Sequence, residues 1–484
     1  MSLTALEERL RDDFITLGWP AKAWMPTTTR NGATVHDVLI IGAGQAGLAL
    51  SAALAHVGIT AVLLDKAPLD MEGPWATTAR METLRSPKEL TGPALGIPSL
   101  SFRAWFIAQW GQESWTTLDK IPRLQWMDYL RWYRHATHAD VRNNHQVTAI
   151  RPQADGLVEI DLIVDGQTQV NTWLARRVIL ATGRDGLGGA QVPAFVQSID
   201  RKLWAHSSDV MDYASLRGLH VGVVGAGASA MDSAATALEH GAASVDLLIR
   251  RNDLPRINKS KGSGIPGLTH GQYLLSDTWK WQIRHHINAS QVPPPQGSTL
   301  RVSRHANAFF NLGCAVQQVI QRGNKLHVTT PHGTFVLDFL IVSTGFAIDW
   351  SLRPEFADIA PHVRVWSDRF TPPDEQEDKE LSDSPDLGAL FEFQEKIPGQ
   401  QPGLDRIHCF CYPAALSHGP ISGDIPAISD GARKLAHGLA ALFYREDIAL
   451  HFAELQSYAE PELNGDEWIA ADPAVRIQNL MFSS

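Results

Sequence analysis

The chain has 484 residues, more than the ~100–200 residues of a typical domain, so we expect at least two domains. Hydrophobic residues make up 44% of it, which is ordinary for a globular protein with a sizeable core. With 42 Lys and Arg against 52 Asp and Glu, the net charge of −10 argues against nucleic acid or an anionic membrane as a partner. The three cysteines, Cys314, Cys409 and Cys411, form no CxxC pair, which excludes a disulfide scaffold and a zinc quartet.

The N-terminal residues 1–34 are predicted to form a helical extension. Leu3, Leu6, Leu10 and Phe14 recur at the spacing of one helical face. That face could pack on the protein body or lie on a membrane, and the mixed charges of its polar side favour the protein body. The segment lacks the basic start and apolar run of a secretory signal, and no apolar stretch reaches the ~18 residues of a membrane span. We therefore expect a cytoplasmic protein.

A glycine-rich turn follows the first strongly apolar segment, residues 38–41. Gly42 allows a tight turn, Gly44 lets the backbone approach a pyrophosphate, and Gly47 lets the next helix pack closely on the strand. The amino end of that helix offers unpaired amides to phosphate oxygens. Asp65 ends the next apolar strand about 20 residues beyond Gly44, where a carboxylate can accept hydrogen bonds from ribose hydroxyls.

A second strand–turn–helix unit begins with the apolar segment 219–224 and continues through a GxGxxA turn at residues 225–230. Its next strand ends at Arg250 and Arg251 instead of at a carboxylate. A carboxylate would repel a 2′-phosphate, whereas guanidinium groups bind phosphate through paired charged hydrogen bonds. The second unit is therefore predicted to bind NADPH and the first to bind FAD, so that hydride passes from nicotinamide to flavin. The alternative is that the two arginines form a solvated surface pair.

Two further apolar segments end in glycine turns, at residues 178–183 and 339–345. This order predicts an α/β fold with two Rossmann-like dinucleotide-binding domains, in which the NADPH domain is inserted into the FAD domain. After the extension at 1–34, the predicted FAD domain begins with residues 35–210. The predicted NADPH domain follows at 211–338 and carries an insertion at 255–312, and residues 339–484 complete the FAD domain and add a C-terminal extension.

Several segments outside the two turns resemble one family of flavoproteins. They are Gly73-Pro74-Trp75, similar to a GGxW segment; residues 84–90 (LRSPKEL), similar to a TNxPKEL segment; His206-Ser207-Ser208-Asp209, similar to a His-bearing signature; and the linker turns at 181–183 and 343–345. Together with both glycine turns, they resemble the class B flavoprotein monooxygenases over roughly residues 36–440.

The resemblance implies that NADPH reduces FAD, that O₂ adds at flavin C4a, and that the resulting hydroperoxide oxygenates a small organic substrate at nitrogen, sulfur or a carbonyl. An NADPH oxidase or flavin-dependent reductase, producing H₂O₂ or passing electrons to a partner, would share every cofactor residue. A non-catalytic flavin-binding regulator is a third alternative. The expected partners are a small-molecule substrate and O₂, without nucleic acid or membrane, and a homodimer is common in such families. The lack of a CxxC pair favours oxygen as the electron acceptor.

Arg85 and His206 are the candidate catalytic residues. Arg85 stands where the family usually has asparagine, and it could stabilise an anionic peroxide or reduced flavin, or serve in a structural ion pair. His206 belongs to a degenerate FxGxxxH signature, because Asp200 and Lys202 occupy two of its earlier positions. It could take part in chemistry or position the linker. No metal is predicted.

The residues predicted to bind the two cofactors lie in or beside these segments. They are Gly42, Gly44, Gln45, Ala46, Gly47, Asp65, Lys66, Trp75, Arg85, Val147, Ala181, Thr182, Gly183, Gly225, Gly227, Ala228, Ser229, Ala230, Arg250, Arg251, Thr344, Gly345 and Asp424. Asp424 precedes the helix that begins near Ile428 and resembles the last FAD contact of such proteins, although the same residues could form an ordinary helix cap.

Residues 260–312 are rich in aromatic and apolar side chains, among them Tyr273, Trp279 and Trp281. They could line an apolar substrate pocket or pack the insertion against the FAD domain.

Overall fold

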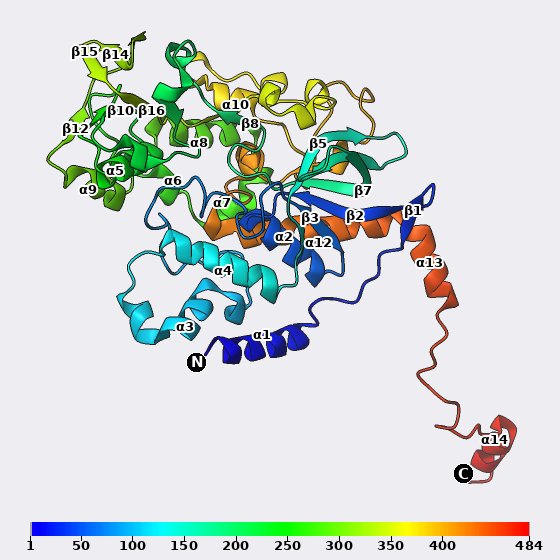
Figure 1. Ribbon diagram of the computed structural model, residues 1–484. Helices are drawn as coiled ribbons and strands as arrows, with labels where there is room; N and C mark the ends of the chain where they lie inside the picture. Colours follow the sequence, from blue (N-terminus) through cyan, green and yellow to red (C-terminus); the bar gives the residue numbers. More distant parts are fainter. Residues whose placement is uncertain (1, 484) are drawn as a thin grey trace. The chain divides into compact units, whose positions relative to one another are not determined.

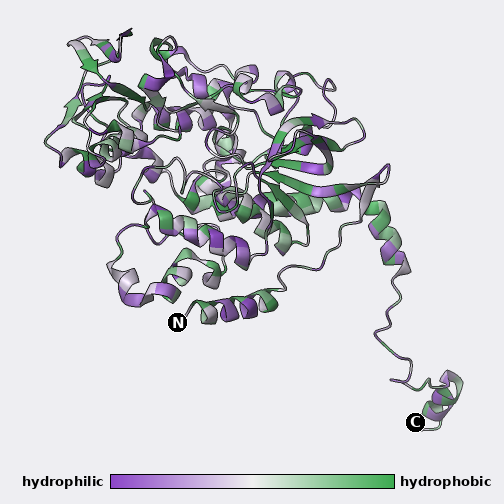
Figure 2. Cartoon of the chain, viewed as in Figure 1, coloured by the Kyte–Doolittle hydropathy of each residue, from purple (hydrophilic) through white to green (hydrophobic). Residues whose placement is uncertain are grey.

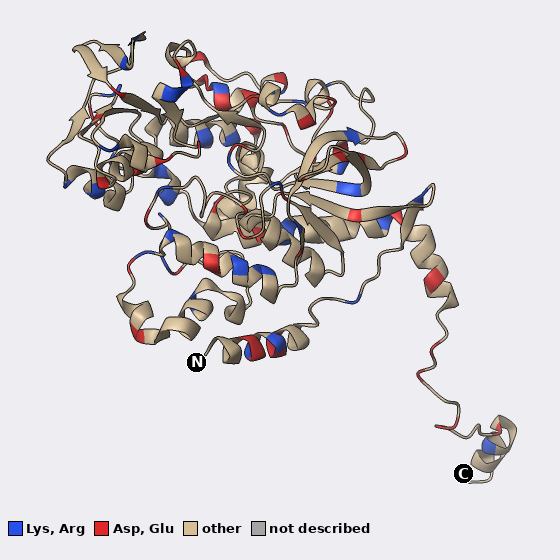
Figure 3. Cartoon of the chain, viewed as in Figure 1, with Lys and Arg blue, Asp and Glu red and all other residues tan. Residues whose placement is uncertain are grey.

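The computed structural model of the protein describes residues 2–483 and divides into two units, one up to residue 440 and one from residue 441 onward (Figure 1). The first unit contains two large sheets and every residue predicted to lie at the active site. Figure 2 shows hydrophobic residues concentrated in the central strands and in the helices that cover them. Acidic and basic residues are interspersed over the ribbon in Figure 3.

The first sheet has eight strands and forms around the first glycine turn. Its parallel part runs in the order β4–β3–β2–β7, with β18 parallel to the carboxyl end of β7. The antiparallel strands β6 and β5 continue from β7, and β1 pairs with β2. The strands are β1 (Thr28–Arg30), β2 (Ala33–Ile41), β3 (Ala61–Leu64), β4 (Asp140–Arg142), β5 (His145–Pro152), β6 (Val158–Val164), β7 (Val170–Leu180) and β18 (Ile407–Cys409). The predicted strand 38–41 is the buried end of β2, as its continuous run of apolar residues requires in a sheet covered on both faces.

Helices cover this sheet and its loops. They are α1 (Leu3–Leu17), α2 (Gln45–His56), α3 (Phe102–Thr117), α4 (Arg123–Ala136), α10 (Lys379–Asp383), α11 (Ala415–His418) and α12 (Ile428–Glu446). The helix predicted near the N-terminus is confirmed as α1. It buries Leu6 and Leu10, one helical turn apart, and the Trp132 indole of α4 donates to Glu7 over 3.2 Å. Its apolar face therefore packs on the protein body.

The second sheet consists of five parallel strands in the order β12–β11–β10–β16–β9. They are β9 (Trp204–His206), β10 (His220–Val224), β11 (Ser244–Leu248), β12 (Ala308–Asn311) and β16 (Phe339–Val342). The predicted limits of 211 and 338 leave out β9 and β16, and the predicted insertion 255–312 takes in β12. These short strands join the sheet only through pairing with partners far away in the chain. We propose that the second domain spans residues 204–342.

Both faces of the second sheet are covered. Helix α5 packs on one face in a core that includes Met231, Val245 and Ile341, and a three-stranded antiparallel sheet packs on the other. That small sheet is formed by β13 (Gln318–Arg322), β14 (Lys325–Thr330) and β15 (Gly333–Leu337). The helices of this half are α5 (Ala228–Glu239), α6 (Lys259–Gly262), α7 (Pro266–Gly271), α8 (Asp277–Ser290) and α9 (Gln296–Ser303).

The chain passes between the two large sheets twice. The first passage contains β8 (Gly188–Ala190) and the second contains β17 (Phe346–Ile348). These two strands pair antiparallel, and the Gln191 amide also donates to the Gly345 carbonyl over 2.9 Å. The two passages therefore form one two-stranded ribbon.

The unit that begins at residue 441 contains the end of α12, together with α13 (Ile448–Ser457) and α14 (Pro473–Met481). In α14, Val475, Ile477 and Leu480 are exposed. Across residues 2–483, no helix combines the length and the apolar character needed to cross a membrane.

Candidate active site

The first glycine turn has the geometry that a pyrophosphate requires. Gly42 has a φ of +105°, and a side chain at Gly47 would lie 2.0 Å from the Gly42 carbonyl oxygen. Open space surrounds Gly44, where a Cβ would meet no atom within 4 Å. Helix α2 begins directly after Gly44, and within the described chain no side chain caps its first amides. The turn therefore presents free N–H groups and an unobstructed backbone, which fits the pyrophosphate of FAD.

Asp65 holds this turn from the end of β3. Its two carboxylate oxygens accept hydrogen bonds from the Ala43 and Ala67 amides, each over 2.8 Å. A carboxylate offers about four acceptor positions, so Asp65 can hold the turn and still accept from a ribose hydroxyl. Lys66 beside it is exposed.

Other predicted FAD residues surround the turn. A Cβ at Gly73 would lie within 4.0 Å of both Trp75 and Gly44, so this segment packs against the open turn. Val147 is half-buried on β5, next to a register shift in the pairing with β6. In α2, the Gln45 amide oxygen is buried and has no hydrogen-bond partner among residues 2–483, so an acceptor next to the turn is left for a ligand.

The turn at the end of β7 lies at the same edge of the sheet. β2 and β7 are parallel and adjacent, and the Ala181 amide donates to the Ile41 carbonyl over 2.9 Å. Thr182 donates to the Gly186 carbonyl over 3.2 Å, and Gly183 has a φ of +87°. The carboxyl ends of parallel strands are where open α/β sheets bind their ligands.

The second glycine turn repeats the first one in the second sheet. Gly225 has a φ of +129° and a Cβ there would lie 2.7 Å from the Ser343 carbonyl oxygen, while the space around Gly227 is open. Helix α5 begins at Ala228, and within the described chain its first amides also lack a side-chain cap. Ser229 is exposed beside them, whereas Ala230 is buried against the strand. This arrangement fits a second dinucleotide.

Arg250 and Arg251 follow β11 at the carboxyl edge of this sheet. Arg250 is exposed and Arg251 is half-buried. Among residues 2–483, neither guanidinium group has an ion-pair or hydrogen-bond partner. Two unpaired cations at the position that contacts the adenosine ribose fit a 2′-phosphate.

Arg85 connects the two halves of the molecule. Its guanidinium group donates to the Pro293 carbonyl, in the loop between α8 and α9. Burial lowers the pKa of Arg85, and the carboxylate of Asp232 on α5 partly offsets this effect. The structure thus places Arg85 against the second domain, and a catalytic role for it stays a prediction.

His206 is buried at the end of β9. Its Nδ1 lies 2.7 Å from the Ser208 hydroxyl, and its backbone amide donates to Asp209 over 2.6 Å. Burial lowers the pKa of His206, against the opposite effect of Asp209. At neutral pH we expect a neutral imidazole, and its ring lies 5.9 Å from that of Phe346 at the start of the second passage between the sheets. Thr344 and Gly345 lie on the second passage, where Thr344 donates to the Gln191 carbonyl.

Asp424 lies beside a group of side chains that the sequence did not bring together. The Arg184 guanidinium lies 3.8 Å over the ring of Tyr412, and Arg284 Nη2 donates to the Tyr412 hydroxyl over 3.5 Å. Burial raises the pKa of Asp424, while Arg284 and Arg184 lower it. Arg184 and Tyr412 follow β7 and β18, Asp424 precedes α12, and Arg284 comes from α8 in the second domain.

Comparison with known proteins identifies what this arrangement is. Residues 39–271 match the family described as pyridine nucleotide-disulphide oxidoreductase. An FAD-dependent urate hydroxylase from Xanthomonas campestris pv. campestris is 36% identical over 478 residues, covering 98% of this chain and 100% of that protein. The chain belongs to the class B flavoprotein monooxygenases. It is therefore an FAD- and NADPH-dependent oxidoreductase that oxygenates a small organic molecule.

Solved structures of this family show the same fold. The ornithine hydroxylase from Pseudomonas aeruginosa has a TM-score of 0.66 at 15% identity, covering 84% of this chain and 99% of that one. The L-lysine 6-monooxygenase from Pseudomonas syringae has a TM-score of 0.61 at 15% identity, covering 85% and 99%. The predicted α/β fold with two Rossmann-like domains is confirmed.

The insertion packs against the FAD half of the monooxygenase, which is the second of the two alternatives considered for its aromatic residues. Trp281 of α8 is fully buried with Trp366 and Leu416, and its indole donates to the Gln376 carbonyl over 2.9 Å. Tyr273 stacks on the ring of His418 at 4.8 Å. Trp279, by contrast, is exposed.

His418 and Lys434 form a second group that sequence analysis missed. The His418 imidazole lies between the rings of Tyr273 and Phe391, and its Nε2 lies 2.9 Å from the Gly388 carbonyl. Lys434 Nζ lies 3.0 Å from His418 Nδ1. Burial lowers the pKa of His418 to about 3 and that of Lys434 to about 8. His418 is therefore neutral and accepts a hydrogen bond from Lys434.

The two neighbouring cysteines, Cys409 and Cys411, are fully buried free thiols. Their Sγ atoms lie 3.5 Å apart. No group of three or more His, Cys, Asp and Glu side chains in residues 2–483 is arranged to hold a metal ion.

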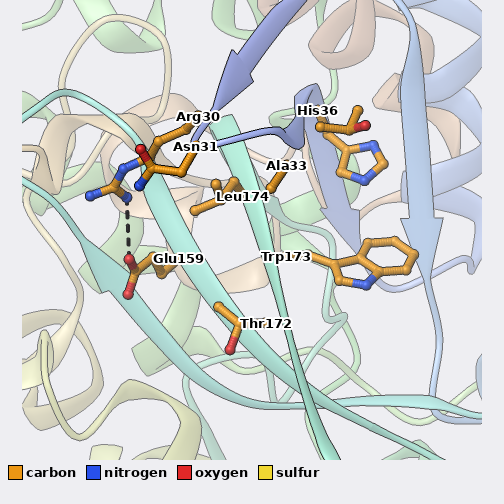
Figure 4. Close-up of a pocket in the computed structure, with 9 residues that line it drawn as sticks. Arg30, Asn31, Ala33, His36, Glu159, Thr172, Trp173 and Leu174 are labelled. Atoms are coloured by element: carbon orange, nitrogen blue, oxygen red, sulfur yellow. Dashed lines mark hydrogen bonds and ion pairs between the residues drawn. The ribbon is translucent and has the colours of Figure 1, made fainter.

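A surface hollow of about 540 Å³ lies away from all of these residues. It is lined by Ala33 and His36 at the amino end of β2 and by Trp173 on β7 (Figure 4). His36 and Trp173 stack at 5.0 Å, and Arg30 is paired with Glu159 at 3.2 Å. The hollow therefore lies at the end of the strands opposite the glycine turns, and it takes no part in the candidate active site.

Proposed function

We propose that this monooxygenase hydroxylates urate or a closely related planar purine, with FAD as its bound cofactor and NADPH as its reductant. The observation that carries the proposal is the 36% identity to a urate hydroxylase along 98% of the chain. An alignment of that extent includes both glycine turns, both passages and the insertion. The unpaired arginines after β11 further support NADPH.

Each half of the chain would bind one cofactor. We assign the FAD pyrophosphate to the turn at Gly44 and its ribose to Asp65, and the NADPH pyrophosphate to the turn at Gly227. When bound, the flavin would accept hydride from NADPH and activate O₂. The protein would keep the two nucleotides aligned and exclude water from between them.

We assign a different structural role to each of the two candidate catalytic residues. Arg85 would hold the loop at Pro293 against the FAD half, because its guanidinium group donates to that carbonyl. His206 would be a positioning residue, since its imidazole is buried and bonded to Ser208. A cytoplasmic location and a homodimeric assembly stay predictions from the sequence.

Turnover with ¹⁸O₂ tests the proposal. One urate, one O₂, one NADPH and one proton should yield hydroxylated urate with one ¹⁸O atom, NADP⁺ and one water. Stoichiometric H₂O₂ without labelled product would instead identify an NADPH oxidase. Flavin that stays oxidised when NADPH is added without oxygen would identify a non-catalytic regulator.

A further inference from the structure

We propose that Arg284, Arg184 and Tyr412 form the subsite that binds the planar anionic substrate. The inference rests on the proposed function and assigns residues to its substrate. Urate is a flat ring system with amide-like edges and is an anion at neutral pH. Its recognition calls for a cation with a planar array of donors and for an aromatic surface.

The three side chains meet where the active site must lie. Arg184 directly follows the turn at 181–183, after β7, and Tyr412 follows the adjacent parallel strand β18. The Tyr412 amide donates to the Gly183 carbonyl over 3.2 Å, which joins the two strand ends. This is the sheet edge at which the first glycine turn also lies.

Arg284 reaches this edge from the second domain. On α8 it lies one turn from Lys280 and Trp281 on one side and from Ile287 on the other, and those three residues are buried. It therefore belongs to the helix face that packs on the FAD half. The subsite thus contains groups from both domains and exists only while they are assembled.

Hydrogen-bonding capacity is left unused in this group. Arg284 Nε is buried and has no partner among residues 2–483, and its contact with the Tyr412 hydroxyl is long, at 3.5 Å. A buried donor without an acceptor is costly, and a bound ligand would supply that acceptor. No ion pair of Arg284 or Arg184 is found in the described part of the chain, although Asp424 lies close enough to interact with both.

The two guanidinium groups supply the hydrogen-bond donors of this subsite. Asp424 lies close to both of them, and Asp185 and Glu380 line a pocket together with Arg184 and Tyr412, so the anion would be held by directed hydrogen bonds and not by an excess of positive charge. The guanidinium fork of Arg284 can donate two parallel hydrogen bonds to the edge of a purine anion. Arg184 is stacked on the Tyr412 ring, which keeps that cation in place.

The test is equilibrium binding of urate to the oxidised, FAD-loaded enzyme, followed by flavin absorbance and by dialysis. Arg284→Gln and Arg184→Gln should each raise the Kd for urate about 10- to 100-fold, as expected for loss of a charged hydrogen bond. FAD content and the Kd for NADPH should stay unchanged. Arg284→Lys should recover part of the affinity. His286→Gln, on the exposed side of the same helix, is the matched control and should bind urate like the wild type.

Each other result has a distinct meaning. If the wild type hydroxylates urate and both glutamine variants bind it unchanged, the subsite is wrong and the proposed function stands. If either variant loses FAD or NADPH affinity instead, the arginines belong to a cofactor site and the inference is overturned. If the wild type neither binds nor hydroxylates urate, the proposed function itself fails. The uncharged purine hypoxanthine should bind the wild type more weakly than urate, and this preference should shrink in Arg284→Gln.

Discussion

The side chain of Lys434 is surrounded by aromatic rings and by another cation. Its Nζ lies 4.8 Å from the centre of the Tyr273 ring and 3.0 Å from His418 Nδ1. Burial and the charge of Lys280 lower its pKa from 10.5 to about 8, against the opposite effect of Glu392. Single residues of this kind make stability depend on pH, because the folded and unfolded chains then bind protons differently.

We expect the free energy of unfolding to rise between about pH 8 and pH 10 because of Lys434. Over that range the unfolded chain keeps the lysine proton that the folded chain has lost, so alkaline pH favours the folded state. Below pH 8 both states are protonated and the contribution is constant. Lys434→Met should flatten this rise in urea unfolding of the FAD-loaded protein at pH 7 to 10. Lys379→Met, at an exposed lysine, should keep it. Equal slopes in all three proteins would contradict the prediction.

We expect Arg250 and Arg251 to determine the choice of coenzyme, also at the scale of single residues. Replacing both with serine should raise the KM for NADPH about 10- to 100-fold and leave the KM for NADH nearly unchanged. Since neither side chain has a partner in the described chain, stability should change by no more than ~0.5 kcal/mol. Steady-state kinetics with both coenzymes, at saturating substrate, checks this. A parallel loss with NADH would mean that the arginines bind something other than the 2′-phosphate.

At the scale of elements, an ion cluster around the buried Arg301 connects α9 to α5. Arg301 donates to both oxygens of Glu239, over 3.0 and 2.7 Å, and lies 3.6 Å from the buried Asp232. The same guanidinium group donates to the Arg80 carbonyl over 3.2 Å. One side chain thus joins two helices of the second domain to a loop of the first.

Arg301→Met should destabilise the protein by ~3–5 kcal/mol, because it leaves the buried carboxylate of Asp232 without this cation. Arg304 also pairs with Glu239, but its side chain is 58% exposed. Arg304→Met is therefore the matched control and should cost no more than ~1 kcal/mol. Urea unfolding measures both values. Similar losses of unfolding free energy in the two variants would mean that the burial of Arg301 does not increase its contribution to stability.

The elements that could be predicted from the sequence are those with a local signal. Glycine spacing located both turns, and continuous apolar runs located β2 and β10. The strands β9 and β16 are too short for the sequence to indicate which sheet they join, because this is decided by the pairing of β16 with β10 and of β9 with β16. The cluster of Arg184, Arg284 and Tyr412 joins residues from three distant segments. No spacing rule connects them, so only the folded chain reveals it.

At the scale of the whole molecule, the ribbon of β8 and β17 is the connection between the two halves. A Cβ on Gly188 would lie 2.0 Å from the Ala347 carbonyl oxygen, so only glycine fits there. At Gly189 the nearest obstacle is the flexible side chain of Leu352, at 2.9 Å. The two neighbouring glycines therefore offer a graded perturbation of the same ribbon.

Gly188→Ala should force the two passages apart and misalign the nucleotides. We expect flavin reduction by NADPH without oxygen to slow about tenfold or more, since small misplacements of reacting groups are costly. FAD content should be preserved, because the first glycine turn is untouched. Gly189→Ala should have a smaller effect, and stopped-flow absorbance of the flavin measures both rates. Unchanged reduction in Gly188→Ala would show that alignment does not depend on the ribbon.

The pairing of the two passages has a mechanical consequence. Two bodies joined by one strand can twist and bend in any direction, whereas two strands bonded edge to edge form a strip. A strip bends more easily across its flat face than sideways. We therefore expect the NADPH half to rotate relative to the FAD half mainly about one axis, set by bending of the β8–β17 ribbon across its flat face. The conformation that admits the coenzyme and the conformation that closes over the flavin would then be two positions of the same rotation.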